Sequence, residues 1–204
     1  MGKMTLLVLF VASVAGHQDK KDVENPRFRE WSGFKPGSWV TFEQPWGKDG
    51  QRQETDKLVE ITPEKAVFES TIVENGFKYP VFQKVISSTL KAIQGPEYAV
   101  ACNPGGGEME FQGPGGKMKS LWRKCDQGDE VIEVAGKKLK CPWIKMEYEE
   151  KSAIQVLNDH RWTKTWTSAE IPGGVAQLEM TRLISGNPPE TLVVTRVLKG
   201  WKKE

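Results

Sequence analysis

The 204-residue sequence lacks a strong excess of charge of one sign. Its 29 lysines and arginines stand against 27 acidic residues, which leaves a formal net charge of +2. A nucleic-acid-binding domain usually carries a basic patch or stripe, whereas the basic residues here are spread among acidic ones. We therefore expect no nucleic-acid partner.

The sequence also lacks the common motifs of catalysis. No serine lies in a G-x-S-x-G motif, and His17 and His160 are the two histidines of the chain. The glycine-rich residues 95–116 lack the Ser or Thr that completes a P-loop, so we expect them to form a surface loop. The glutamates of the segment MEYEE could act as glycosidase carboxylates, but surface charge explains them more simply. We expect a protein that is not an enzyme and that needs no cofactor.

Long apolar runs are missing as well. The run from Thr5 to Val14 has about ten residues, while a membrane-spanning helix needs roughly 20. Lys3 precedes this run and small residues follow it, as in a secretory signal peptide that is cleaved near Ala15–Gly16. We therefore expect no transmembrane segment and an exported protein, periplasmic or extracellular. The expected parts are a signal peptide at residues 1–16, a flexible lead-in at 17–30, and a single β domain at 31–204 with its glycine-rich loop at 95–116.

Cysteine is scarce, and no C-x-x-C pair suggests zinc or thioredoxin chemistry. The three cysteines are Cys102, Cys125 and Cys141. An exported protein can hold one disulfide among them with one thiol left over, and the spacing does not choose the pair.

The histidines raise a separate metal hypothesis. If the signal peptide is cleaved after Gly16, His17 becomes the N-terminal residue. Its amine and imidazole, together with the imidazole of His160, would then match the ligands of a copper redox enzyme.

Segments with strand-like alternation are abundant. They include GSWVTFEQ, QETDKLVEIT, AVFESTIV, LKCPWIKMEYEE, VAQLEMTRLI and ETLVVTRVLKGW, and turn signals such as ENG and AGKK lie between them. Residues 81–93 are ambiguous, because Pro80 favours an edge strand while Val81, Val85 and Ile86 also fit one face of a helix. The predicted fold is mainly β: an antiparallel, highly curved sheet, or β half-barrel, with one short helix.

Eight tryptophans are many for a chain of this size. In the segment RWTKTWTS, side chains alternate between the two faces of a strand, so Trp162, Lys164 and Trp166 should share one face. Large rigid aromatic side chains on a curved sheet suit a ligand site, although they can equally fill a core. The candidate ligand-binding residues are Trp39, Phe42, Phe68, Trp143, Trp162 and Trp166.

Two segments carry a family resemblance. VIEVAGKKLKC followed by RWTKTWTSAEIPGGVAQLEM resembles a pattern of exported bacterial proteins of unknown function, in which a Gly-Lys hairpin precedes a cysteine strand and a W-x-S-x-x-[VI]-P-G-G strand and turn. The matching residues are Gly136, Lys137, Cys141, Trp166, Ser168, Ile171, Pro172, Gly173 and Gly174. The order of strands also resembles the periplasmic lipoprotein-carrier (LolA-like) class. This resemblance implies a half-barrel around an apolar cavity that binds acyl chains or lipoproteins, and it carries over no catalytic residue.

Three functional hypotheses follow from the sequence. The first is non-catalytic binding of a lipid, an acyl chain or a lipoprotein on the concave face of the sheet. The second is an envelope or extracellular interaction protein whose core is filled and holds no ligand. The third is the copper redox enzyme with His17 and His160. Nothing in the sequence defines the oligomeric state.

Overall fold

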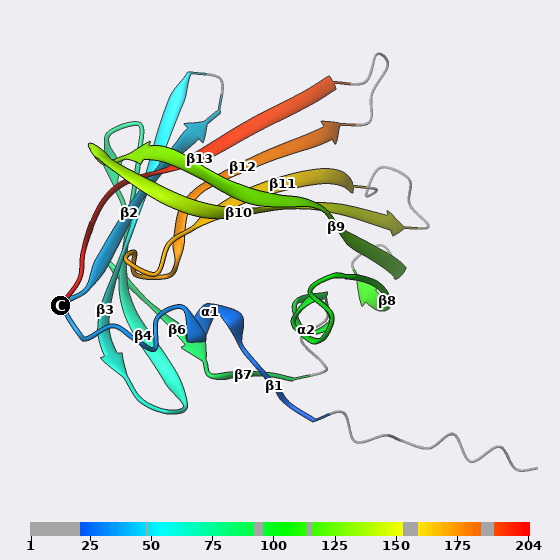
Figure 1. Cartoon of the computed structure of the whole chain (residues 1–204), viewed down its shortest axis with the longest axis horizontal. Coiled ribbons are helices and arrows are strands. Elements are labelled where there is room, and N and C mark those ends of the chain that lie inside the picture. The colour runs from blue at the N-terminus through cyan, green and yellow to red at the C-terminus, as the bar shows by residue number, and fades with distance from the viewer. Residues whose placement is uncertain (1–20, 48, 92–95, 114–115, 153–158, 185–189) are drawn as a thin grey trace, which may run out of the picture.

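The structure is a computed structural model that describes residues 21–47, 49–91, 96–113, 116–152, 159–184 and 190–204 (Figure 1). His17 and the expected cleavage site lie outside the described residues. The described helices are α1 (Pro26–Arg29) and α2 (Pro96–Cys102). The described strands are β1 (Val23–Glu24), β2 (Trp39–Trp46), β3 (Gly50–Ile61), β4 (Lys65–Glu74), β5 (Phe77–Lys78), β6 (Phe82–Ser87), β7 (Thr89–Leu90), β8 (Gly106–Gly113), β9 (Gly116–Val134), β10 (Lys137–Ser152), β11 (Asp159–Thr167), β12 (Val175–Ile184) and β13 (Glu190–Lys202).

One antiparallel sheet contains nearly all of these strands. Its order is β5-β4-β3-β2-β13-β12-β11-β10-β9-β8, and β6 also pairs with β4, so the two ends of the described sheet do not close on each other. The sheet curves, with β2, β3 and β4 running across the direction of β9 to β13 (Figure 1). The predicted fold class, a mainly β protein with a curved antiparallel sheet, is confirmed.

Two tight turns explain why neighbouring segments pair as hairpins. Asn75 and Gly76 join β4 to β5 with φ angles of 51° and 82°, and Ala135 and Gly136 join β9 to β10 with φ angles of 48° and 74°. Positive φ at both central residues matches the right-handed twist of the flanking strands. The hairpin signals ENG and AGKK therefore predicted both turns correctly.

The expected single helix is placed differently in the structure. The ambiguous residues 81–93 do not contain it, because Phe82–Ser87 and Thr89–Leu90 are strands. β6 pairs with the edge of β4, from Lys65↔Ser87 to Ser70↔Phe82, and these ladder hydrogen bonds outweigh the helical spacing of the apolar residues. The described helical segments are instead α1 and α2, both short.

The expected lead-in contains the strand β1 and the helix α1 within residues 23–29, and its flexibility stays a prediction. Asn25 caps α1 by accepting a hydrogen bond from the Arg27 backbone N–H at 3.1 Å. The Asn25 backbone N–H also donates to the Ser88 carbonyl at 2.8 Å, and its side-chain amide donates to the Ser87 carbonyl at 2.9 Å. This segment is therefore attached to the strands β6 and β7.

The glycine-rich stretch is also more regular than the predicted loop. It contains α2 and β8, and β8 pairs with β9 from Gly106↔Arg123 to Gly113↔Gly116. The Trp122 indole donates to the Asn103 carbonyl at 2.9 Å. A Cβ at Gly107 would lie 2.9 Å from the Trp122 ring, so glycine there allows β8 to lie close to this indole.

The Pro-Gly-Gly turn between β11 and β12 belongs to the core. Ile171 and Pro172 are fully buried, and Gly173 lies against the indole of Trp31. Trp31 in turn packs edge-to-face on Phe68, with ring centres 4.7 Å apart. The turn thus closes one end of the core, which also contains Val40, Leu58, Cys141, Trp166 and Leu198.

Neither of the described helices is long and apolar enough to cross a membrane.

Candidate functional site

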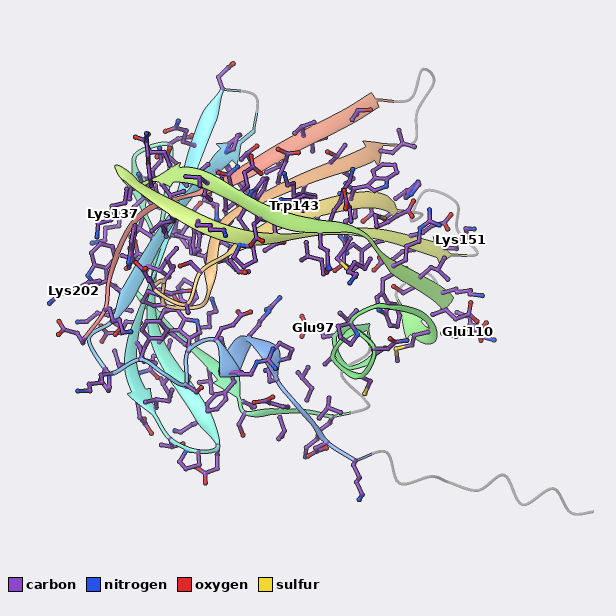
Figure 2. The ribbon with its side chains drawn as sticks, in the orientation of Figure 1. Glu97, Glu110, Lys137, Trp143, Lys151 and Lys202 are labelled. Carbon is purple, nitrogen blue, oxygen red and sulfur yellow. The ribbon has the colours of Figure 1, made fainter. Side chains whose placement is uncertain are left out.

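Three tryptophans meet on one side of the strands β10 and β11. Trp143 on β10 pairs directly with Trp166 on β11. Trp162 lies four residues before Trp166, on the same side of β11. We call this side of β10, β11 and β12 the tryptophan face. Figure 2 shows Trp143 between the turn end of β10, marked by Lys137, and its other end, marked by Lys151. The prediction that Trp162 and Trp166 share a face is confirmed by this register.

Lys164 lies between two of the indoles. Its ammonium is 4.3 Å from the ring centre of Trp143 and 4.3 Å from that of Trp166. The same ammonium donates to Glu130 at 3.0 Å, and the Trp166 indole N–H donates to the same carboxylate oxygen at 3.0 Å. The hydrogen bonds from Lys164 and Trp166 lower the pKa of Glu130. Cation–π attraction and these hydrogen bonds together fix the positions of the two rings.

A second group of polar side chains, formed by His160, Glu147 and Arg123, lies next to Trp162. The His160 ring lies 4.2 Å from the Trp162 ring, and its Nε2 is 2.8 Å from Glu147 Oε1. Arg123 Nε donates to the other oxygen of Glu147. The hydrogen bond with His160, followed by that from Arg123, lowers the pKa of Glu147. Within the described residues, no hydroxyl or thiol is bonded to this His–Glu pair that could serve as its nucleophile.

A small hollow lies beside these residues. It has a volume of about 180 Å³ and is lined by Lys145, Trp162, Thr163, Lys164, Glu179 and Thr181. Lys145 is exposed and makes no ion pair with any described residue, whereas Lys164 is paired with Glu130. The hollow therefore offers an indole wall, two threonine hydroxyls, the ammonium of Lys145 and the carboxylate of Glu179, a set that suits a small polar group.

Exposed apolar side chains border the hollow on one side. Trp162 pairs with Thr181, and Thr181 pairs with Val193 on β13, so these three share the tryptophan face. Leu183 follows Thr181 on the same side of β12. Val193 is 55 % exposed and Leu183 is 38 % exposed. A polar hollow and an exposed apolar strip thus lie next to each other.

The six aromatic candidates do not form one surface. Trp143, Trp162 and Trp166 come together on the tryptophan face, although Trp166 is itself buried at its end of the face. Phe42 and Phe68 are buried in the core. Trp39 packs over Gly200, where a Cβ would lie 3.1 Å from its ring. Contact of any of the six with a ligand stays a prediction.

Sequence reasoning missed the charged residues of this face. Glu130, Arg123 and Lys145 stand in segments of mixed charge, a pattern that is also typical of ordinary solvated surface. A signal was present in β10, where Trp143, Lys145 and Glu147 alternate and must share one side of the strand. The partners on β9 could not be foreseen, because the register shifts between Lys145 and Met146.

The three cysteines are free thiols in the structure. Cys102 ends α2 and Cys125 lies on β9, both exposed, while Cys141 is fully buried on β10. Burial raises the pKa of the Cys141 thiol, and the charge of Glu170 adds to this effect. The structure thus contains none of the disulfides considered from the sequence.

The copper hypothesis rests on a residue outside the described part of the chain, His17. Its partner His160 lies within β11 and is hydrogen bonded to Glu147. Among the described residues, no three His, Cys, Asp or Glu side chains cluster as metal ligands would.

No family profile matches the chain, and no curated protein matches it. Solved structures that resemble it include a predicted exported protein with a YmcC-like fold from Bacteroides fragilis, at 12 % identity and a TM-score of 0.44, covering 90 % of this chain and 100 % of that one. A predicted lipoprotein from Parabacteroides distasonis has 12 % identity and a TM-score of 0.45, with 82 % and 96 % covered. The hypothetical lipoprotein YmcC from Escherichia coli has 12 % identity and a TM-score of 0.38, with 87 % and 89 % covered.

These likenesses are too distant to carry an argument about function or about individual residues. The W-x-S-x-x-[VI]-P-G-G motif and the lipoprotein-carrier class therefore stay predictions.

Proposed function

We propose that this chain is an exported, non-catalytic binding protein that holds an amphiphile, such as a lipid or the acyl chain of a lipoprotein, on the tryptophan face. Export is inferred from the signal-peptide pattern of residues 1–16. The observation that carries the binding proposal is the hollow of about 180 Å³ directly beside Val193 and Leu183. A polar recess next to an exposed apolar strip matches a molecule with a small polar head and a hydrocarbon tail.

The polar head would occupy the hollow. Its volume is below that of pockets for whole drug-sized ligands, roughly 300–1,000 Å³, but a carboxylate or phosphate group is much smaller. Lys145 makes no ion pair with a described residue, so its ammonium is available to a negative head group. Glu179 also lines the hollow and would repel a negative head group, which favours a head with no more than one negative charge.

The hydrocarbon tail would lie along Trp162, Leu183 and Val193. Covering apolar surface contributes about 25 cal/mol per Å² before the cost of ordering the chain is subtracted. Because the strip is open rather than enclosed, we expect modest affinity and ready exchange, as a carrier requires.

The second candidate function, an interaction protein without a ligand, is favoured by a different observation. Phe42, Phe68 and Trp166 are buried in one packed core, so the aromatic side chains fill the end of the sheet where Trp31 lies. Under this hypothesis the tryptophan face contacts a protein instead of an amphiphile.

A titration with lauric acid, monitored by two-dimensional amide NMR, distinguishes the amphiphile-binding proposal from the interaction-protein hypothesis. The amphiphile proposal predicts saturable shifts centred on Trp162, Thr181 and Val193. The variant Val193→Asp should weaken binding by about tenfold, since it places a charged carboxylate where the apolar tail must pack. Val131→Asp is the matched control, because Val131 is a comparably exposed valine on β9 at 63 % exposure. Shifts that are absent, or that are equally weakened by Val131→Asp, would contradict the proposal.

A further inference from the structure

A group of exposed apolar side chains lies along the edge of the sheet that β5 and β6 form. Phe77 is 64 % exposed, Val85 58 %, Val81 57 %, Phe82 43 % and Tyr79 40 %. We call these five residues the edge patch, and none of them belongs to the tryptophan face. Large apolar side chains that gather on a protein surface usually mark a site of contact with another protein or with a membrane.

The three aromatic rings of the edge patch share one face of the sheet. Phe77 pairs with Glu74 on β4. Phe82 pairs with Ser70, which lies four residues before Glu74 on the same strand. Because side chains alternate along a strand, both rings point to the same side. The Tyr79 ring lies there too, since its centre is 5.0 Å from that of Phe77 and its hydroxyl donates to Glu74 at 2.8 Å.

Val85 extends the edge patch to the other face of the sheet. Val85 pairs with Val67, whereas Phe82 pairs with Ser70, so Val85 and Phe82 point to opposite sides. A partner that lies on one face of the sheet would cover only part of this patch. A medium that surrounds the edge covers both faces, and the boundary between the head groups and acyl chains of a bilayer is such a medium.

The backbone of this edge is protected against the addition of another strand. Pro80 has no N–H to donate, and one extra residue before Phe82 interrupts the ladder with β4. At the other end of β6, Asn25 donates to the carbonyl groups of Ser87 and Ser88. Proteins use such features to prevent edge-to-edge pairing. They disfavour a partner that would extend the sheet, including a second copy of this chain.

The polar groups near the aromatic rings are already paired with one another. Arg52 donates to one oxygen of Glu74 at 3.0 Å, and Tyr79 donates to the other at 2.8 Å. The Arg52 guanidinium also lies 4.8 Å from the ring centre of Trp46, which is 40 % exposed. Burying a polar group is costly mainly where its hydrogen-bond partner is missing. The rings can therefore enter a less polar environment without carrying an unpaired charge with them.

Lys78 supplies a charge that suits a membrane better than an apolar protein partner. It is exposed and makes no ion pair with any described residue. Glu74 is the one acidic residue in the segment 74–87, and it is paired with Arg52. A lysine can lay its stem along apolar groups while its ammonium reaches the phosphate groups of a membrane surface. At protein interfaces, by contrast, lysine is depleted.

We propose that the edge patch docks the protein on the surface of a lipid bilayer. Phe77, Tyr79 and Phe82 enter the boundary region of the bilayer from one face of the sheet, and Val85 enters it from the other face. Lys78 contacts the lipid phosphate groups. Since the edge patch is separate from the tryptophan face, this docking does not depend on whether that face binds an amphiphile.

Sedimentation of the mature protein with phospholipid vesicles tests the proposal. One vesicle type is phosphatidylcholine alone, and the other contains equal parts of phosphatidylcholine and phosphatidylglycerol. The wild type should bind both types, and should bind the anionic type more tightly. Phe77→Asp and Val85→Asp should each weaken binding by about tenfold, because each places a carboxylate where an apolar side chain enters the bilayer. Lys78→Gln should weaken binding by about fivefold, and only to the anionic vesicles.

Val131→Asp is the matched control for Val85→Asp, because Val131 is a valine of similar exposure, 63 %, on β9. Val193→Asp is the control for the tryptophan face. Both controls should bind vesicles as the wild type does, and circular dichroism confirms that every variant is folded. Lauric acid binding should be weakened by Val193→Asp and not by Phe77→Asp, so failure of one site leaves the test of the other intact.

Three results would overturn the docking proposal. The first is a wild type that binds neither vesicle type; if it self-associates instead, the edge patch belongs to a contact between copies of the chain. The second is wild-type affinity in both Phe77→Asp and Val85→Asp. The third is a loss of vesicle binding in Val193→Asp as large as in Phe77→Asp, which would assign membrane contact to the tryptophan face.

Discussion

The backbone of Gly173 lies directly against the indole of Trp31, and a Cβ added there would be 2.7 Å from the indole nitrogen. Gly173 also has φ +77°, a conformation that side chains rarely adopt. We predict that Gly173→Ala lowers the free energy of unfolding by about 2–4 kcal/mol, which combines backbone strain with overpacking of the core. Urea denaturation measures this change.

Gly136→Ala is the control for that variant. Gly136 has nearly the same φ, +74°, but a Cβ there meets no atom within 4 Å. Its cost should be the backbone strain alone, about 1–2 kcal/mol. Equal losses in the two variants would mean that the Pro-Gly-Gly turn does not pack on Trp31.

Glu147 should make stability depend on acid pH. Its hydrogen bonds with His160 and Arg123 lower its pKa in the folded protein below the ordinary 4.5. The folded state therefore binds this proton less readily than the unfolded state, so the stabilisation is present above pH 4.5 and is lost as pH falls through the lowered pKa. Glu147→Gln should remove this part of the dependence between about pH 3 and 6, as measured by urea denaturation across that range. An unchanged slope in the variant would contradict the arrangement of His160, Glu147 and Arg123.

Glu30 should make stability depend on pH in the direction opposite to that of Glu147. Burial raises the pKa of its carboxyl, and the charges of Arg29 and Arg27 only partly offset this effect. The charged form is thus disfavoured in the folded state, and stability contributed by the protonated form is lost as pH rises through the raised pKa. Glu30→Gln should stabilise the protein at pH 7 and show a smaller effect near pH 4 in thermal unfolding. Glu64→Gln, at an exposed glutamate, serves as the control; a pH-independent effect of Glu30→Gln would argue against burial as its cause.

The three cysteines should differ in their accessibility to a thiol reagent. Cys102 and Cys125 are exposed free thiols, whereas Cys141 is fully buried with a raised pKa. Thiolate, the reactive form, is therefore least available at Cys141. The folded protein should release two equivalents of thionitrobenzoate from Ellman's reagent, and a third only after unfolding. Release of no equivalent from the folded protein would indicate a Cys102–Cys125 disulfide in solution.

The local parts of the fold follow from the sequence, and the parts that depend on distant partners do not. The turns at Asn75–Gly76 and Ala135–Gly136 are encoded by the residues themselves, and alternation alone places Trp162 with Trp166. By contrast, β6 is a strand because β4 offers a free edge, and Asn25 is ordered by carbonyl groups more than 60 residues away. Neither relationship leaves a periodic signal in its own segment.

The candidate site also has features that one segment encodes and features that depend on distant partners. Two indoles of the tryptophan face, Trp162 and Trp166, could be grouped from one strand, but the ion pair of Lys164 with Glu130 requires three strands in a particular register.

The central claim is that the tryptophan face binds an amphiphile, and native mass spectrometry of the protein purified from an export-competent host tests it most directly. The account predicts a co-purified lipid or acyl chain on the wild-type protein and on Val131→Asp, with a strongly reduced bound fraction on Val193→Asp. A wild-type spectrum that contains only ligand-free protein and remains so after incubation with excess lauric acid would contradict the account.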